Sequence, residues 1–522
     1  MNVYPIDWLI LAVIFAAFLG LAIYVNSFVR SVADYLVSGR KVRVWLGMGA
    51  GIAGELGLVA VASICEQGYM RGFSFVLIGI LSMIIMVPLF GMFGFGIQRF
   101  RATKAMSVPQ YIEMRYSTRL RIMVGFFNCI AGVFQMCIFP IVGANFIKVL
   151  IHAPDNAVIA GMTIPVSWII MAVFLSATII FTYLGGYITL IVTNFFQMII
   201  IMTALCWIFF LIITKTGLQA YWTGMEQAKG AAGFYPFSGE GDSYSIIWFL
   251  WMILMGILLQ FSYGPYLQKY ASMDRPKTAS RSYLWGTLFG NGRTFIVLAL
   301  GVAALGAMGT GIPSGVSVGK TEWANMATPY YLSQMIPSVL MGIFLAGLLF
   351  ADVACTDQYI LTWSTSIVND CICPFKKTPF TPQAHIRAVK ITILILCVVF
   401  FFFGMIYKPT LPIWEYLWLC ANIIGGTGIA VLFGMYWKRA TTAGAYTAIL
   451  ISLVLPVADL AARQVYEVVH PGKAFWLKPE TTGFATYVIA TVLLLSISLL
   501  SKKETKYWDL GKAVKEMNAV TK

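Results

Sequence analysis

A series of long apolar runs separated by short polar segments constrains this chain more than any other feature. A membrane-spanning helix needs about 20 mostly apolar residues, and thirteen runs meet that length. They are residues 7–27, 44–65, 73–98, 120–150, 165–184, 187–214, 245–269, 282–307, 334–370, 386–406, 411–437, 441–462 and 482–500. Only 11% of the 522 residues are charged, which is too few to cover a soluble surface of this size. The sequence therefore predicts an all-α polytopic membrane protein. Its predicted partner is the lipid bilayer, and we expect it to bind no nucleic acid.

The basic residues indicate an orientation. The net charge is +15, and if the N-terminus is outside, 26 of the 36 Lys and Arg fall on the cytoplasmic side and nine on the other side. The cytoplasmic set includes the four from Lys269 to Arg281. Cytoplasmic loops carry the excess of positive charge in membrane proteins. We therefore expect a multi-pass protein of the plasma (inner) membrane with its N-terminus outside, its C-terminus in the cytoplasm and the first run retained as a helix.

Two of the predicted spans contain sequence that interrupts a smooth helix. GAGIAGELG at 49–57 places four glycines and a glutamate in the second span, and SYGP at 262–265 places glycine and proline in the seventh. Each break opens a block of five spans, and because five is odd the two blocks have opposite orientations. Paired broken helices in two inverted halves are typical of secondary transporters, which bind solute and ions at the breaks. The alternative is that the glycines only permit close helix packing.

This pattern divides the chain into four predicted parts. They are residues 1–43 with an extra helix and a cytoplasmic loop, 44–214 with the first five-helix repeat, 245–437 with the inverted second repeat, and 438–522 with two C-terminal helices and a cytoplasmic tail.

A few polar side chains lie at membrane depth, where a charge costs at least about 2.5 to 3.5 kcal/mol. They are Glu55, Arg293, Asp352 and Asp357, with Asn194 and Gln260 as uncharged companions. Glu55 lies within the first break, where it could bind a cation together with freed backbone groups or pair with a neighbouring helix. Arg293 is about 18 Å beyond Arg281 along a helix, so it must meet a carboxylate of the protein or of the solute.

The two aspartates are five residues apart, or about 140° around a helix, so they cannot share one face. We expect one to face the solute or ion path and the other a neighbouring helix or a water-filled crevice. A carboxylate buried in this way could carry a proton. Asp352, Asp357, Glu55 and Asn194 are therefore the candidates for coupling.

Two other functional classes fit the sequence less well. A membrane-embedded enzyme needs a nucleophile with a base, or a metal cluster, at membrane depth, but His152, His385 and His470 all fall in predicted loops. We therefore expect no enzyme. A solute sensor on a transporter fold would carry a signalling domain, whereas only a short Lys-rich stretch follows residue 500.

Several local sequences, in order along some 400 residues, resemble motifs of the solute/sodium symporter family of sugar, proline, pantothenate and sialic-acid transporters. They are ADYLVSGR at 33–40, EQGYMRGF at 66–73, SVPQYIEMRY at 107–116, YLGGYITLIVTNFFQ at 183–197, YLQKYASM at 266–273 and YWKRATTAGA at 436–445. The resemblance implies a ten-helix inverted-repeat core of the leucine-transporter type, with an extra N-terminal helix, discontinuous first and sixth core helices and further C-terminal helices. It also implies symport of a small solute with Na⁺, without an obligate protein partner.

The resemblance also implies where sodium would bind. The positions that match the family's site are the carbonyls of Ala53, Leu56 and Ala351 and, where the family has hydroxyls, Ala354 and Cys355. A methyl group and a thiol are poor ligands for a hard cation. The family's aspartate in the fifth core helix is here Asn194. Either sodium binds with the help of Asp352, Asp357 or Glu55, or coupling has moved to protons or disappeared.

The positions that match the family's solute site are Glu55, Gln260 and Tyr263, with Arg293 one turn from Gly290, where sugar transporters have a lysine. Val59 stands at a position that is polar in the sugar transporters. The resemblance therefore implies a small zwitterion, organic acid or amine as the solute, rather than a neutral polyol.

Overall fold

Long apolar helices make up most of the structure, as the spacing of the apolar runs predicts. The computed structural model describes residues 3–26, 35, 38–239, 244–313, 318–376, 378, 380–407, 411–470, 475–502 and 509–519, apart from the side chains of 184, 185 and 467. The motif at 33–40 therefore lies partly outside the described residues.

The elements of the first half are, in chain order, α1 (Pro5–Asn26), η1 (Ser38–Arg40), α3 (Val44–Gly54), α4 (Leu58–Arg71), α5 (Ser74–Met86), the π-helix η2 (Val87–Met92), α6 (Ile97–Ala102), α7 (Val108–Arg115), α8 (Thr118–Met136), α9 (Phe139–Leu150), β1 (Asn156–Ile159), β2 (Met162–Pro165), α10 (Val166–Thr216), α11 (Leu218–Lys229) and η3 (Gly230–Gly233).

The elements of the second half are α12 (Ile246–Ser262), α13 (Gly264–Ser272), α14 (Pro276–Met308), α15 (Lys320–Met335), α16 (Leu340–Ser366), the π-helix η4 (Ile367–Ile372), η5 (Cys373–Phe375), α17 (Pro382–Ile406), α18 (Ile413–Asn422), α19 (Gly425–Tyr436), α20 (Thr442–Val469), α21 (Pro479–Leu500) and α22 (Leu510–Ala519).

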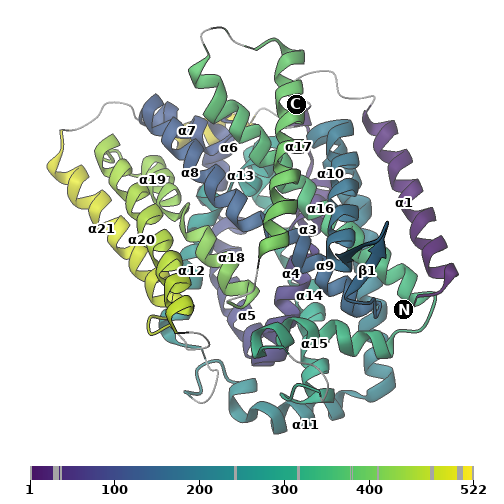
Figure 1. Ribbon diagram of the computed structural model, residues 1–522. Coiled ribbons are helices and arrows are strands. Elements are labelled where there is room, and N and C mark those ends of the chain that lie inside the picture. The colour runs from purple at the N-terminus through teal and green to yellow at the C-terminus, as the bar shows by residue number, and fades with distance from the viewer. Residues whose placement is uncertain are drawn as a thin grey trace.

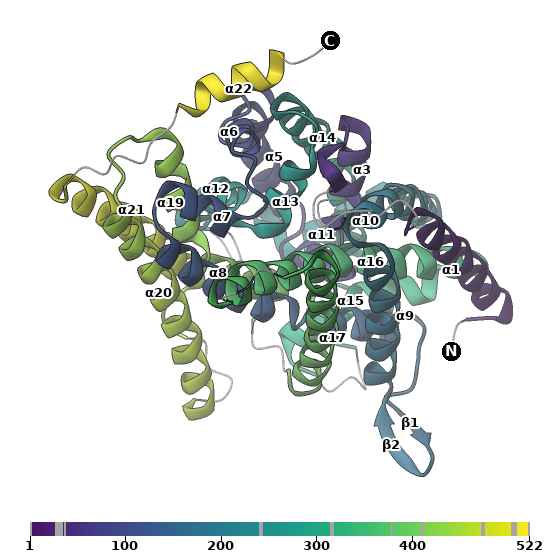
Figure 2. The same cartoon turned by 90° about the horizontal axis from the view of Figure 1, so that it is seen from above.

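The described residues contain ten helices that are long and apolar enough to cross a membrane, and three bent helix pairs that raise the number of candidate spans to thirteen. This confirms the predicted fold class. Figure 1 shows these helices as a bundle with α1 and α21 on opposite sides. The only described strands, β1 and β2, pair in an antiparallel hairpin that extends away from the bundle (Figure 2).

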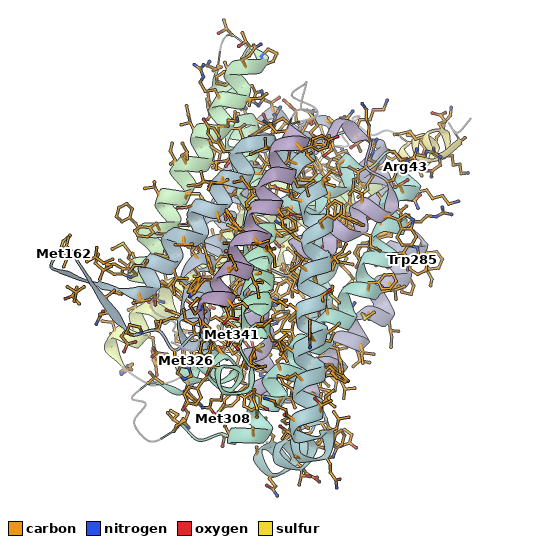
Figure 3. The ribbon with its side chains drawn as sticks, turned by 90° about the vertical axis from the view of Figure 1, so that its right-hand side faces the viewer. Arg43, Met162, Trp285, Met308, Met326 and Met341 are labelled. Carbon is orange, nitrogen blue, oxygen red and sulfur yellow. The ribbon has the colours of Figure 1, made fainter. Side chains whose placement is uncertain are left out.

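One helix forms the centre of the bundle. In α16, 94% of the most apolar stretch is buried, against 17% in α1. Because α16 also packs against α10, α1 and α17, its polar side chains have no access to lipid. The outer surface is apolar, as contact with lipid requires, and Trp285 of α14 projects from it in Figure 3.

Three spans are bent at breaks of a few residues. The pair α3 and α4 is bent by 63° and the pair α12 and α13 by 52°, at the two places where the sequence predicts breaks. The third pair, α18 and α19, is bent by 50° and was not predicted. A further kink divides α10 at Gly186, whose φ of 57° only glycine adopts readily.

Two motifs that lie far apart in the sequence hold each other in place. Arg115, at the end of α7, is buried and donates from Nε to the carbonyl of Gly434 (3.1 Å) and from Nη2 to that of Ala440 (2.9 Å). The hydroxyl of Tyr116 donates to the carbonyl of Ala430 (2.8 Å). The motifs at 107–116 and 436–445 are thus a structural junction between α7 and the segment around α19.

Candidate functional site

The first break exposes backbone groups in the middle of a span. α3 ends at Gly54, and Glu55 follows as its C-cap, with its N–H donating to the carbonyl of Gly51 (3.2 Å). The N–H of Leu56 donates to the carbonyl of Ala53 (3.1 Å) before α4 begins at Leu58. The break therefore directs one carboxylate into the interior, at a point where the helix hydrogen bonding stops.

The second break is a single residue. Tyr263 ends α12 and precedes α13, with φ −78° and ψ 112°, so its backbone is extended. The following glycine and proline allow a new helix to begin in a new direction, since proline is well suited to the first turn. The buried hydroxyl of Tyr263 donates to Oε1 of Gln135 in α8 (2.9 Å).

An ion pair joins the two broken spans. Nζ of Lys269, in α13, lies 2.8 Å from Oε1 of Glu55, and the two side chains are 9% and 33% exposed. The rings of Tyr266 and Tyr270 lie 5.7 and 5.8 Å from the ammonium, close enough for cation–π attraction. The last turn of α3 also favours a cation at its negative end.

Lys269 is the residue that the sequence reasoning placed wrongly. We counted it with the cytoplasmic loop cations, but the structure places it within α13, with its side chain largely buried. Its position only six residues beyond the break could have indicated that it lies within the second half-helix, because such a half-helix continues for at least two turns.

A cavity of about 230 Å³ surrounds this ion pair. Glu55, Gln260 and Arg293 all line it, so the structure brings together three of the four predicted solute-site residues. Gln260 accepts a hydrogen bond on Oε1 from the hydroxyl of Tyr270 (2.6 Å). The remaining lining residues are Met48, Gly51, Tyr266, Lys269, Tyr270, Ser282, Tyr283, Gly286, Thr287, Gly290, Asn291 and Thr294.

The fourth predicted solute-site residue, Tyr263, faces a different and smaller space. A cavity of about 100 Å³ is lined by Tyr263, Glu55 and Cys355, together with Val59 and aromatic side chains that include Trp414 and Trp418. Glu55 and Tyr266 line both cavities, so the two spaces adjoin at these side chains.

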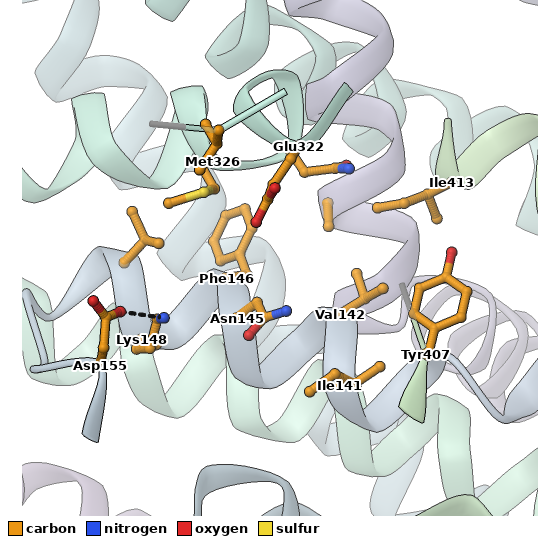
Figure 4. A pocket seen from close by; sticks show the side chains of 14 residues that line it. Ile141, Val142, Asn145, Phe146, Lys148, Asp155, Glu322, Met326, Tyr407 and Ile413 are labelled. Carbon is orange, nitrogen blue, oxygen red and sulfur yellow. Dashed lines mark hydrogen bonds and ion pairs between the residues drawn. The ribbon is translucent and has the colours of Figure 1, made fainter. Parts of the chain in front are cut away.

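A third cavity, of about 440 Å³, is lined mainly by residues of α9 and α15 (Figure 4). Its lining includes Ala62, Glu322 and the ion pair between Lys148 Nζ and Asp155 Oδ1 (2.8 Å). The hydrogen bond from Lys148 lowers the pKa of Asp155, which stands on an exposed loop.

The predicted ion-site residues lie where α16 passes the first break. Cys355 packs so closely on Gly57 that a Cβ there would lie 2.7 Å from its Sγ. The carbonyl of Ala354 accepts a hydrogen bond from Nδ2 of Asn194 in α10 (3.2 Å). Ala351 is buried in the same helix, which packs against both α3 and α4, and Ala53 and Leu56 of the break are buried as well.

The two aspartates of α16 are buried but do not line any of these three cavities. Oδ1 of Asp352 and Oδ1 of Asp357 have no hydrogen-bond partner within the described part of the chain. Neither forms an ion pair with Arg293 among the described residues. Glu55 is the carboxylate that lines a cavity together with Arg293, and it is paired with Lys269.

A second polar network, which the sequence reasoning missed, joins the end of α4 to the start of α18. Arg71 Nη2 lies 3.1 Å from Glu415 Oε1, and Gln67 Nε2 donates to Glu415 Oε2 (3.3 Å). Glu66 Oε2 accepts from the N–H of Ile413 (2.9 Å) and so caps α18. The cluster of Glu66, Gln67 and Arg71 on two turns of one helix was the available signal.

Comparison with known proteins identifies relatives with this architecture. The model of the sodium:solute symporter family matches residues 35–452. The sodium/sialic acid symporter of Proteus mirabilis (strain HI4320) is 22% identical over 476 residues, which cover 88% of this chain and 89% of that protein. A sodium/proline symporter of Staphylococcus aureus is 23% identical over 337 residues, covering 62% of this chain and 61% of that protein.

Solved structures agree on the fold. The structure of a Na⁺-coupled sialic acid symporter in a substrate-bound, outward-open state has a TM-score of 0.76 and 19% sequence identity, and covers 96% of this chain and 99% of its own. A nucleobase-cation-symport-1 family transporter in a closed conformation has a TM-score of 0.54 and 12% identity, covering 92% and 98%. At these identities the likeness shows the fold alone.

Proposed function

The chain belongs to the sodium:solute symporter family of membrane transporters, and from this premise we propose that it imports a small polar organic solute, charged or zwitterionic, at the two helix breaks. As a member of this family it is a secondary transporter and not an enzyme. The observation that carries the proposal is the Glu55–Lys269 ion pair, which joins the breaks beside a cavity lined by Gln260 and Arg293. Charged side chains at membrane depth that line a cavity are typical of a solute pathway.

The position of the cavity supports a direction of transport. Its lining includes residues of α3 and α13, the halves of the broken spans that adjoin segments with basic residues, which we predict to be cytoplasmic. In Figure 3, Arg43 lies toward one end of the bundle and Met308 toward the other. With the N-terminus outside, we expect the cavity to open to the cytoplasmic half, and a solute that enters from outside to pass Tyr263 before it reaches Glu55.

Coupling to sodium is the family's property, and we propose that in this chain the sodium site at α16 is weakened. The residues at the matching positions fit sodium poorly, because Ala354 and Cys355 bring no hydroxyl oxygen and Asn194 directs an N–H, rather than an oxygen, at the Ala354 carbonyl. The alternatives are sodium binding with help from Asp352, Asp357 or Glu55, proton coupling through one of these carboxylates, or uncoupled transport.

Uptake into proteoliposomes under separate sodium and proton gradients tests the proposal. A ligand screen by thermal stabilisation, with and without sodium and across pH, first identifies a solute. We expect accumulation of that solute, driven by at least one gradient or, if coupling is lost, exchange across the membrane. Binding without any accumulation or exchange would instead favour a solute sensor with this fold.

Glu55 provides the second test. Replacing Glu55 with Gln should change the dependence of solute binding on pH. Unchanged uptake across pH in this variant would contradict a central role for Glu55.

A further inference from the structure

The charges around the 230 Å³ cavity do not cancel. Three of its lining residues, Glu55, Lys269 and Arg293, are charged at neutral pH, whereas its tyrosines are neutral. Glu55 and Lys269 compensate each other through their 2.8 Å ion pair. The cavity therefore carries one uncompensated positive charge, and that charge is Arg293.

Arg293 is buried in a position that favours the binding of an anion. The residue is only 6% exposed and lies within α14, and its Nε and Nη1 have no hydrogen-bond partner among the described residues. A guanidinium that stays charged at all ordinary pH values and loses its water is unfavourable unless an anion accepts its hydrogen bonds. Because Arg293 lines the cavity, the place for that anion is the cavity itself.

We propose that the solute is a small organic anion with one carboxylate, and that Arg293 binds this carboxylate. The assignment rests on the proposed transport function and narrows it from charged or zwitterionic solutes to monoanions. The volume of the cavity suits a molecule smaller than a typical drug-sized ligand. Ser282, Thr287 and Asn291 line the same cavity and supply groups for hydrogen bonds to hydroxyl or carbonyl oxygens of the solute.

The same geometry disfavours the other two charge classes. The ammonium group of a zwitterion needs Glu55, but Glu55 already accepts Lys269. A zwitterion would therefore have to displace Lys269 and leave its ammonium buried without a carboxylate. A simple amine meets the net positive charge of the cavity and has no free carboxylate to bind.

Probes that share one carbon skeleton separate these classes. The purified full-length protein is mixed with lactate, lactamide, alanine or 1-amino-2-propanol, and with the six-carbon set 6-hydroxyhexanoate, its amide, 6-aminohexanoate and 6-aminohexanol. Thermal unfolding is followed as a function of probe concentration. We expect the carboxylate of at least one set to stabilise the protein at a concentration ten or more times lower than its matched partners.

Variants then test whether Arg293 is the cause. Arg293→Gln should remove the preference for the carboxylate over the amide, whereas Arg293→Lys keeps the charge and should keep the preference with a changed affinity. If Arg293→Gln does not fold, the variants of Glu55 and Lys269 described in the next paragraph test the preference for the carboxylate over the amide instead. Retention of the full preference by a folded Arg293→Gln would overturn the proposal.

The net charge of the cavity is a second, independent variable. Lys269→Gln brings it to zero, Glu55→Gln to two positive charges, and the double variant returns it to one. The ratio of carboxylate to amide affinity should fall in Lys269→Gln, rise in Glu55→Gln and still favour the carboxylate in the double variant. Equal ratios in all three would contradict the charge argument.

Failure of the anion assignment can be distinguished from failure of the proposed solute site. If the amide, the zwitterion or the amine stabilises the wild-type protein more strongly than the carboxylate, the anion assignment is wrong while the solute site stands. If no probe in either set stabilises the protein at any concentration, the proposed solute site itself is contradicted, and the anion assignment falls with it.

Discussion

Lys269 Nζ and Glu55 Oε1 lie 2.8 Å apart although 214 residues separate them, so one ion pair connects the two helix breaks. The lysine comes from α13 and the glutamate from the end of α3. The pair thus connects the two broken spans beside the cavity that both of them line.

The two halves of the pair should contribute unequally to stability. Glu55→Gln leaves a 9% exposed ammonium without its carboxylate, whereas Lys269→Gln leaves a 33% exposed carboxylate that still shares a cavity with Arg293. We expect Glu55→Gln to lower the free energy of unfolding by about 1–3 kcal/mol, a value reduced from that of a fully buried pair because Glu55 is partly solvated. Lys269→Gln should cost less. Thermal unfolding in detergent measures both, and equal losses would count against this assignment of partners.

Sodium dependence should respond to oxygen ligands at α16. The double variant Ala354→Ser with Cys355→Ser supplies two hydroxyl groups beside the break, and a hard cation prefers oxygen to sulfur or methyl. We expect sodium to stabilise this variant at a lower concentration than it stabilises the wild-type protein, by about tenfold if one effective ligand adds about 1.4 kcal/mol. Cys355→Ala, which adds no oxygen, is the control. The same sodium response in wild type and double variant would show that the site lies elsewhere.

The spans were predictable from sequence because a bilayer imposes its own length on each apolar run. The first two breaks were predictable for a local reason as well, since glycine and proline within an apolar run interrupt helix hydrogen bonds. The third break, after Asn422, was missed. Its only sequence sign is the pair Gly425 and Gly426, and no charge marks it.

The partners of the buried charges were not predictable from sequence. Lys269 follows a break by six residues, and the rule that basic residues mark cytoplasmic loops does not distinguish a loop from an inner half-helix. Arg293 is buried within the candidate span α14, but whether a carboxylate of α16 reaches it depends on the rotation of α16 about its axis. That rotation is set by packing against α10, α1 and α17, which no local pattern records.

The network at the far end of α4 should behave as a coupled unit. Arg71 forms an ion pair with Glu415, and Glu66 lies close by, where it accepts the N–H of Ile413. Arg71→Gln removes the positive charge that stabilises two neighbouring carboxylates, so we expect it to destabilise the protein by about 3–5 kcal/mol. Adding Glu415→Gln should recover part of this loss, because it removes one of the two carboxylates. A double-mutant cycle on thermal unfolding measures the coupling, and strictly additive effects would contradict it.

The crossing of α4 and α14 supplies the most local prediction. A Cβ added at Gly301 would lie 2.2 Å from the carbonyl oxygen of Cys65, so the two backbones touch and neither can yield by rotating a side chain. Gly301→Ala should therefore lower the free energy of unfolding by about 1–3 kcal/mol through overpacking.

Gly292, on the same helix, is the control, because it has open space around the position of a Cβ. Gly292→Ala should leave stability unchanged or raise it by up to about 1 kcal/mol, the difference in helix propensity. Thermal unfolding of the two purified variants compares them directly. If Gly301→Ala were as stable as Gly292→Ala, α4 would not pack on α14 as closely as these distances require.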